Sequence, residues 1–240
     1  MRVKIIAFDI YGKFAHFRKF YTNSSSLTYS VPPRTTIEGM IAALLGYERD
    51  SYYELLGADK LNIAVKKIGA TRKIMQSLNY MKADSPGKLN SPTEHTQIPF
   101  EILTGDRNLR YRIFLYHIDD AIQDEIKKRT KNNRPVFPLY FGCAPFSCYI
   151  EYIDEYEWEW AISSEYKNIT TVIDTSRISK INIESMDGSL IKERMTRDFS
   201  VGRTIKEVCS YIYEQEGRSL NVIIEGGFCR LSNGENIMFL

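Results

Sequence analysis

The sequence predicts an α+β fold, and three observations predict it. Segments rich in β-branched and aromatic residues recur at strand length along the whole chain. Two stretches, residues 35–46 and 119–132, instead have the apolar spacing or the charge pattern of a helix. The length of 240 residues, with 43% hydrophobic composition, is enough for one large core or for a core domain with a smaller companion.

The first strand is expected at residues 3–12, where a short apolar run carries Asp9 and ends at Gly12. We interpret this run as a buried strand rather than a signal peptide, and no segment approaches the ~18 apolar residues of a membrane span. The loop that follows, "YGKFAHFRKFY", contains six ring-bearing side chains and four that are positive or can become so. Rings interleaved with cations are typical of surfaces that bind single-stranded RNA.

A helix is expected after this loop. Pro32 and Pro33 keep the approach extended, and Thr35 is placed to cap the first turn. Glu38 completes a capping box, and Gly46 ends the helix. Apolar residues recur between them at helical spacing, namely Ile37, Met40, Ile41, Leu44 and Leu45.

The middle of the chain predicts two strands separated by an insertion. Residues 60–75 are expected to form the second strand, and residues 107–118, which alternate along their length, the third. Residues 76–106 contain prolines in turn contexts and are too long for a simple connection in a compact domain. We therefore expect the insertion to be a protruding thumb hairpin.

A second helix and a fourth strand follow. Residues 119–132 carry acids in the first helical turn and bases in the last, which matches the helix dipole. Residues 135–146 are a loop rich in Pro, Gly and aromatic residues, and residues 147–153 have strand character. The resulting order, β-α-β-β-α-β, is the ferredoxin-like arrangement that RRM folds share.

Two regions are expected on this basis. Residues 1–155 would form an RRM-like (ferredoxin-like) domain with the thumb inserted at about 76–106. Residues 156–240 contain short strand-like segments separated by turns and would form a small antiparallel β region. No RRM ribonucleoprotein motif is present, so we expect RNA to bind differently from RNA lying across an ordinary RRM sheet.

Charge is distributed unevenly although the net charge is only +2. Residues 1–75 carry 12 Lys and Arg against 6 Asp and Glu, whereas residues 151–240 carry 10 against 16. The first part is therefore expected to present a basic face to a polyanion. The acidic segment "EYIDEYEWEW" is a poor nucleic-acid surface, and it is expected to link the two regions or to meet a basic protein.

Signatures of metal, cofactor or catalytic sites are weak. The four cysteines form no C-x-x-C pair, so we expect reduced, partly buried thiols and no zinc site. No P-loop, dinucleotide fingerprint, G-x-S-x-G or paired-carboxylate motif is present, so no cofactor is expected. Metal-independent RNA cleavage needs a base and an acid. The three histidines, His16, His95 and His117, are the candidates, and each is expected to be a binding or structural residue instead.

Several segments together resemble a known family. They are "FDIYGKFAHFRKFY", "YSVPPRTTIEGMIAALLG", "IPFEILTGDRNLRYRIFLYHI", "PVFPLYFGCAPFSCYIE" and the final "ENIMFL". The chain resembles the fifth-type CRISPR-associated (Cas) subunit, a RAMP protein of type I Cascade complexes, with spacing most similar to the type I-B branch. The resemblance runs from near residue 3 to the C-terminus, and "VPPRTTIEGMIAALLG" is its most specific part.

The resemblance implies a subunit of an antiviral surveillance complex. Such subunits hold the 5′ handle of the CRISPR RNA, cap one end of the backbone and contact the large subunit that recognises the protospacer-adjacent motif. The expected partners are therefore CRISPR RNA, the Cascade backbone and large subunits and, through the complex, target DNA, in the cytoplasm and without a membrane.

Three functions remain open from the sequence. One branch of the family cuts CRISPR RNA precursors, but its Tyr–Lys–His set does not map onto this chain residue by residue. A non-catalytic RNA-binding subunit is therefore the expected function. The alternatives are a metal-independent endoribonuclease that processes the precursor, and a ferredoxin-like interaction module that binds no nucleic acid.

RNA contacts are expected from rings that stack on bases, cations that neutralise phosphates and a helix N-terminus that seats a phosphate. The expected RNA-binding residues are Lys13, Phe14, His16, Phe17, Arg18, Lys19, Tyr29, Arg34, Thr35, Thr36, Lys66, Lys67, Arg72, Lys73 and Arg107.

Overall fold

The computed structural model describes residues 4–91 and 93–240, so Val3 of the expected first strand and Pro92 of the expected thumb lie outside it. Its central antiparallel sheet has the strand order β4-β6-β1-β7. The bounds of its elements are β1 Ile5–Ala15, α1 Arg34–Leu45, β4 Leu61–Ile68, β6 His95–His117, α3 Asp120–Lys131 and β7 Tyr149–Tyr156. These elements follow the expected β-α-β-β-α-β order, and the α+β class is confirmed.

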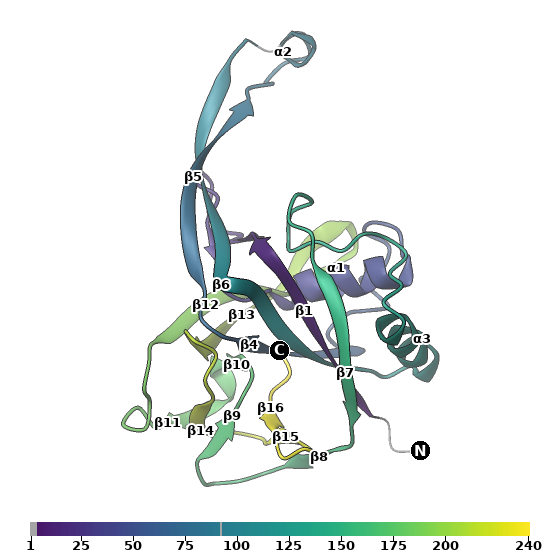
Figure 1. Cartoon of the computed structure of the whole chain (residues 1–240), viewed down its shortest axis with the longest axis vertical. Helices are drawn as coiled ribbons and strands as arrows, with labels where there is room; N and C mark the ends of the chain where they lie inside the picture. The colour runs from purple at the N-terminus through teal and green to yellow at the C-terminus, as the bar shows by residue number, and fades with distance from the viewer. Residues whose placement is uncertain (1–3, 92) are drawn as a thin grey trace.

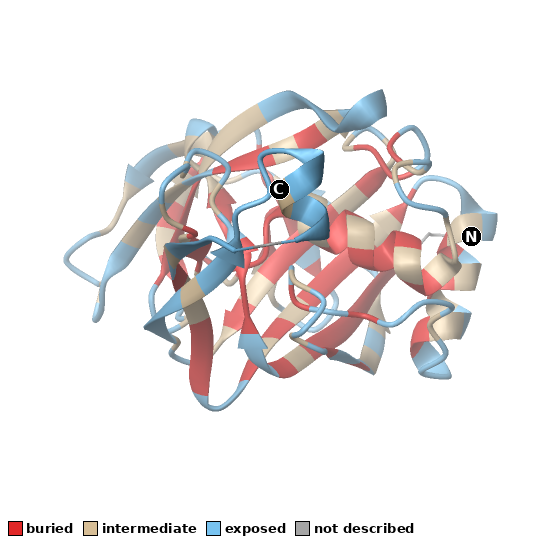
Figure 2. Cartoon of the chain, turned by 90° about the horizontal axis from the view of Figure 1, so that it is seen from above, coloured by how far each residue is buried: buried red, intermediate tan, exposed pale blue. Residues whose placement is uncertain are grey.

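One face of the sheet is covered by the two helices (Figure 1). Alternate side chains of β6 enter the main core on this side, where Ile41 and Ile126 of the two helices also lie. The alternation expected at residues 107–118 is therefore confirmed, because Leu109, Tyr111, Ile113 and Leu115 are buried in the same cluster as residues of α1 and α3. Figure 2 shows the same pattern as alternating buried and less buried positions along the ribbons.

The hairpin leaves this sheet and projects away from the body (Figure 1). β6 is long enough for its second half to lie in the sheet while its first half pairs with β5 (Arg72–Met81). A short helix, α2 (Pro86–Asn90), lies near the tip. The side chains of β5 are almost all exposed, as expected for a hairpin that contacts the rest of the chain only at its base.

The expected single strand at 60–75 is wrong. The chain turns at Gly69, whose φ is +83°, and separates β4 in the sheet from β5 in the hairpin. Hydrophobic patterning did not show this break, because both segments have strand-like sequences and differ only in burial.

Two local expectations near the first helix are also wrong. β1 continues through Gly12 to Ala15, with a shift of register between Gly12 and Phe14. α1 begins at Arg34 with Pro33 at the cap position, two residues before the expected cap Thr35, and no side chain caps it. Glu38 turns into the core instead of completing a capping box, because a buried arginine pairs with it there.

The remaining chain forms short strands and turns around the sheet. After β1, β2 (Phe17–Arg18) pairs with β3 (Thr28–Tyr29). The later sheets have the orders β10-β13-β12, β11-β14-β9 and β16-β15-β8. Their elements are β8 Trp158–Ala161, β9 Lys167–Ile169, β10 Ile173–Asp174, η1 Thr175–Arg177, β11 Ile178–Ile181, β12 Leu190–Ser200, η2 Val201–Arg203, β13 Thr204–Glu214, β14 Leu220–Ile224, β15 Phe228–Leu231 and β16 Asn236–Ile237.

The C-terminal strands share the main core rather than standing apart from it. Met195 and Tyr211, from β12 and β13, belong to the same buried cluster as Phe8 of β1. None of the helices in the described part of the chain has the length and apolar character needed to cross a membrane.

Candidate nucleic-acid interface

A groove of about 820 Å³ opens between the loop after β1, one side of α1, the loop before β7 and the base of the hairpin. These elements are brought together by backbone hydrogen bonds. The N–H of His16 donates to Phe141 in the loop before β7, and the N–H of Ser26 donates to Pro99 in β6. The groove is therefore built from segments that lie far apart in the sequence.

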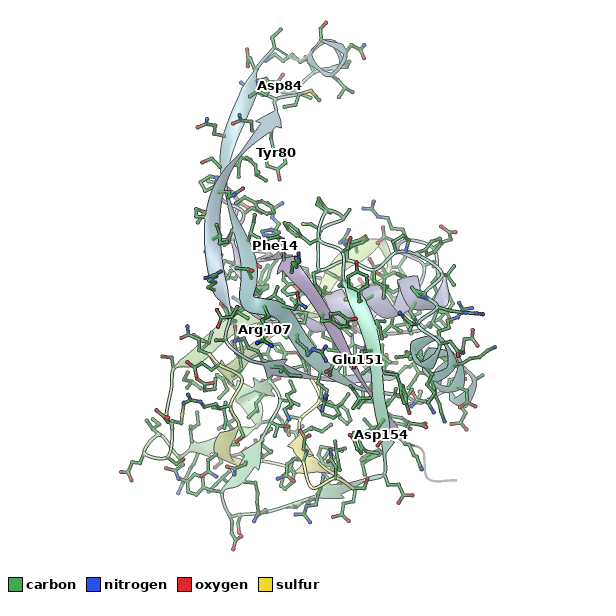
Figure 3. All side chains as sticks on the ribbon, viewed as in Figure 1. Phe14, Tyr80, Asp84, Arg107, Glu151 and Asp154 are labelled. Atoms are coloured by element: carbon green, nitrogen blue, oxygen red, sulfur yellow. The ribbon has the colours of Figure 1, made fainter. Side chains whose placement is uncertain are left out.

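Aromatic rings line much of this groove. Four of them are between 39% and 46% exposed, namely Phe20, Tyr80, Phe137 and Tyr140, and Tyr47, Tyr52 and Phe199 also line it. Figure 3 shows Tyr80 on the hairpin, above the body of the protein. Exposed rings of this kind offer flat apolar surfaces on which unstacked bases can stack.

The charged side chains of the groove are three arginines and two acids. Arg18 comes from β2, Arg49 from the segment after α1, and Arg203 from the turn between β12 and β13. Glu48 and Asp50 lie beside them, so the lining has an excess of one positive charge. Exposed arginines on three separate elements can contact several phosphates of one strand.

His16 forms part of the groove floor and is held rigidly. Its ring stacks on Phe100 at a centroid distance of 4.0 Å. Nδ1 lies 2.7 Å from the carbonyl oxygen of Glu101, so it donates there, and Nε2 accepts from the hydroxyl of Ser26 at 2.9 Å. Burial lowers the pKa of His16, which favours this neutral form of the ring.

The structure brings only part of the expected RNA-binding set to the groove. Arg18, Thr35 and Thr36 line it with side chains that are at least partly exposed. Exposed Lys13 and Phe14 lie near the end of β1, outside the lining, and Arg107 lies on β6 (Figure 3). The other expected residues are buried or ion-paired, except Arg72, which is exposed.

Five of the expected RNA contacts are buried in the folded chain. These residues, none more than 3% exposed, are His16, Phe17, Tyr29, Arg34 and Lys67.

Their partners explain their burial. The ring of Phe17 packs edge-on against Phe141, and the hydroxyl of Tyr29 donates to the carbonyl oxygen of Arg194 at 2.5 Å. Lys67 donates to the carbonyl oxygen of Gln215. These three side chains are therefore engaged within the chain.

Four further cations are placed on β4, β5 or the loop after β1, and three of them pair with acids. Lys19 lies 2.8 Å from Glu193, Lys66 lies 2.7 Å from Glu235, and Lys73 lies 3.2 Å from Glu101. Arg72 is exposed at the start of β5. The paired lysines keep part of their surface, but their charges are largely compensated within the chain.

Sequence reasoning missed several groove residues. Arg49, Phe137, Tyr140 and Arg203 were not among the expected contacts, although all four line the groove. The loop at 135–146 had the aromatic and glycine content that could have indicated a binding segment. Arg203 carried no local signal, since its position depends on the packing of β12 and β13 near α1.

The three histidines occupy different environments. His117 is buried at the end of β6, where Nδ1 accepts from the N–H of Asp119 at 3.0 Å and Nε2 lies 2.9 Å from the carbonyl oxygen of Leu55. His95 is exposed at the start of β6 in the hairpin. Of the three, only His16 lines the groove, and both of its ring nitrogens are already engaged.

A sequence profile and several solved structures are similar to this chain. The profile described as "CRISPR-associated protein (Cas_Cas5)" matches residues 5–207. No curated protein matches the chain significantly.

Two solved structures share its fold. A CRISPR protein from Archaeoglobus fulgidus is 15% identical, with 96% of this chain and 98% of that chain covered and a TM-score of 0.56. A chain from a type III-B Cmr-beta complex bound to cognate target RNA and AMPPnP is 14% identical, with 90% and 86% covered and a TM-score of 0.52.

Proposed function

This chain belongs to the CRISPR-associated Cas5 family, and we propose that it is a non-catalytic RNA-binding subunit of a CRISPR effector complex. In this proposal the groove holds the 5′ handle of the CRISPR RNA, and the chain caps one end of the complex's backbone. The observation that carries the proposal is the groove itself, where exposed rings and three arginines from separate elements converge.

The chemistry of the groove suits a single strand of RNA. Rings stack on bases of any sequence, at about 1–3 kcal/mol per base, and arginines contact phosphates. The N-terminal turn of α1 contributes Thr35 and Thr36 to the same lining. A duplex would hide the bases from the rings, so a single-stranded handle is the better fit.

The proposal also names the type of effector complex and the partner subunits. We assign the chain to a type I Cascade complex of the I-B branch, and we interpret its β-α-β-β-α-β sheet as the ferredoxin-like arrangement of RRM domains. The projecting hairpin would lie against the first backbone subunit, and another surface would meet the large subunit. The complex would act in the cytoplasm on target DNA.

Replacing Arg18, Arg49 and Arg203 together with Ala should weaken binding of the chain's own CRISPR repeat RNA. Each arginine lines the groove, and each phosphate contact releases counterions when it forms. The slope of log K against log salt should therefore become shallower by about 2, at roughly 0.7 per lost contact on a single strand. Filter binding or anisotropy over a salt series measures this slope.

A matched triple variant removes the same charge elsewhere. Lys128, Arg218 and Arg230 are exposed and none of them lines the groove, so their replacement with Ala should leave the slope unchanged. If both triple variants behave alike, the groove is not the RNA site. If the unmodified protein binds no repeat RNA, the proposed function itself is wrong.

The non-catalytic part of the proposal is tested with the histidines. Replacing His16, His95 or His117 singly with Ala should leave the length of mature CRISPR RNA in cells unchanged. A general acid or base contributes about 10²–10⁴ in rate, so the loss of a catalytic histidine would visibly accumulate precursor. Northern analysis of the repeat RNA measures this.

Reduced stability in the buried variants should lower the amount of assembled complex without moving the cleavage position. A histidine variant that accumulates full-length precursor while binding repeat RNA as tightly as the unmodified protein would favour the endoribonuclease instead.

A further inference from the structure

The face of the central sheet opposite the helices is covered along only part of its length. Ala7 of β1 and Phe114 of β6 are fully buried there beneath β15, which contributes Cys229 to the same cluster. β15 does not cover the end of β1 and the start of β7. Phe14 is 42% exposed near the end of β1, and Tyr149 is 57% exposed at the start of β7.

Four aromatic residues gather on the uncovered part, and we call them the aromatic strip: Tyr11, Phe14, Phe146 and Tyr149. The rings of Tyr11 and Tyr149, paired across β1 and β7, have centroids 5.7 Å apart and are tilted by 32°. The rings of Phe14 and Phe146 are 6.3 Å apart. The four rings therefore form two contacting pairs.

Charged neighbours hold one end of the strip in place. The guanidinium of Arg110 lies 4.9 Å from the centre of the Tyr11 ring and pairs at 2.9 Å with both Asp9 and Glu151. Asp9 is buried and also binds Arg112 at 2.8 Å. The arginine that stacks on Tyr11 is therefore fixed before any ligand arrives. Figure 3 shows Glu151 on β7 and Phe14 at the end of β1.

The strip is continuous with the groove through one pair of rings. Phe100 lines the groove, and its ring lies 6.4 Å from that of Phe146, which belongs to the strip. Phe100 itself is only 7% exposed, so a strand that leaves the groove beside it would next meet Phe146 and then Phe14. Exposed Lys13, beside Phe14 in the sequence, can contact the phosphates of that RNA strand.

We propose that the aromatic strip is a second stacking surface, which binds the nucleotides of single-stranded RNA that continue beyond the groove. The proposal rests on the function proposed above. Rings stack on any base, so this surface would extend the bound length without adding a sequence requirement. It lies on the uncovered part of the sheet face, where Phe14 and Tyr149 are exposed.

The test compares two lengths of RNA on the full chain. One probe is the chain's own repeat RNA cut to about 8 nucleotides, enough for the groove, and the other is extended to about 16. The variant Tyr149→Ala removes the most exposed ring of the strip, and Tyr149→Phe keeps a ring as the matched control. We expect Tyr149→Ala to bind the longer RNA about tenfold more weakly and the shorter RNA normally, and Tyr149→Phe to bind both normally.

A second measurement does not depend on the variants. Longer RNA carrying 4-thiouridine in its extension should crosslink, in the unmodified protein, to peptides from the end of β1 and the start of β7. Crosslinks confined to the groove loops would overturn the proposal, whether or not the variants fold.

The outcomes separate the two proposals. If the unmodified protein binds neither RNA, the proposed function fails. If it binds both, but Tyr149→Ala binds the longer RNA like the unmodified protein or weakens both RNAs equally, the strip does not extend the RNA path. If Tyr149→Ala keeps all RNA binding and instead fails to assemble with the other complex subunits, the strip contacts a protein and the proposal is wrong.

Discussion

Replacing Arg34 with Met is expected to lower the free energy of unfolding by about 3–5 kcal/mol, because it leaves buried Glu38 without its counterion and Asp198 with Lys206 alone. The guanidinium lies 3.1 Å from Glu38 and 3.6 Å from Asp198, and all three side chains are at most 2% exposed. Its other amino group donates to the carbonyl oxygens of Leu56 and Leu61, at 2.9 and 2.8 Å.

Several buried polar atoms of this cluster already lack a hydrogen-bond partner in the described part of the chain. Nε of Arg34, Oε1 of Glu38 and Oδ1 of Asp198 are buried without a hydrogen-bond partner among the described residues. Burial raises the pKa of Glu38, and the charge of Arg34 partly offsets this effect. Removal of the arginine would therefore add unpaired charge to a site with no spare donors.

Urea or thermal unfolding of the full chain measures the loss. The control is Arg129→Met, which removes an arginine that pairs with Glu125 at 2.6 Å on the surface of α3. Exposed pairs of this kind contribute about 0–1 kcal/mol. Equal losses in the two variants would show that the Arg34 cluster does not hold α1 against β12.

A second large effect is expected from Gly142→Ala. Gly142 has a φ of +81°, and an added Cβ would collide with the carbonyl oxygen of His16 in the backbone of the neighbouring segment. Backbone strain of this kind alone costs about 1–3 kcal/mol. The collision adds to it, since neither backbone can move without breaking the hydrogen bond from His16 to Phe141.

This variant should lose RNA binding as well as stability, because Gly142 lies in the loop that forms one wall of the groove. Gly202→Ala is a matched control. Its φ is +75°, but nothing lies within 4 Å of the added Cβ, so it carries the backbone strain without the collision. Melting curves and repeat-RNA binding should show a small loss for Gly202→Ala and a large one for Gly142→Ala. Equal losses would contradict the close approach of the two backbones.

Local patterns were enough to predict the elements whose burial repeats along one segment. The alternation at 107–118 and the charge order of the second helix appear in β6 and α3. Asp119 caps that helix by accepting from the N–H groups of Ala121 and Ile122. The length and prolines of residues 76–106 were sufficient to predict a protruding hairpin.

The residues that line the groove could not be predicted from local patterns alone. The loop after β1 was expected to bind RNA, and its Arg18 lines the groove. Other side chains of that loop are not free, because His16 and Phe17 are buried and Lys19 pairs with Glu193 of β12. No pattern near Lys19 could indicate a partner that the chain places there only after the C-terminal strands have packed.

The sequence by itself determined the class of fold, the succession of helices and strands and the composition of the loop that borders the groove, because these follow from propensity and periodicity within short segments. Only the tertiary structure decided which side chains of that loop remain available to RNA. Arg34 is the clearest case: it follows two prolines at the start of a helix and looks like a phosphate contact. The approach of Asp198 gives its charge a buried partner, so it stabilises the core instead.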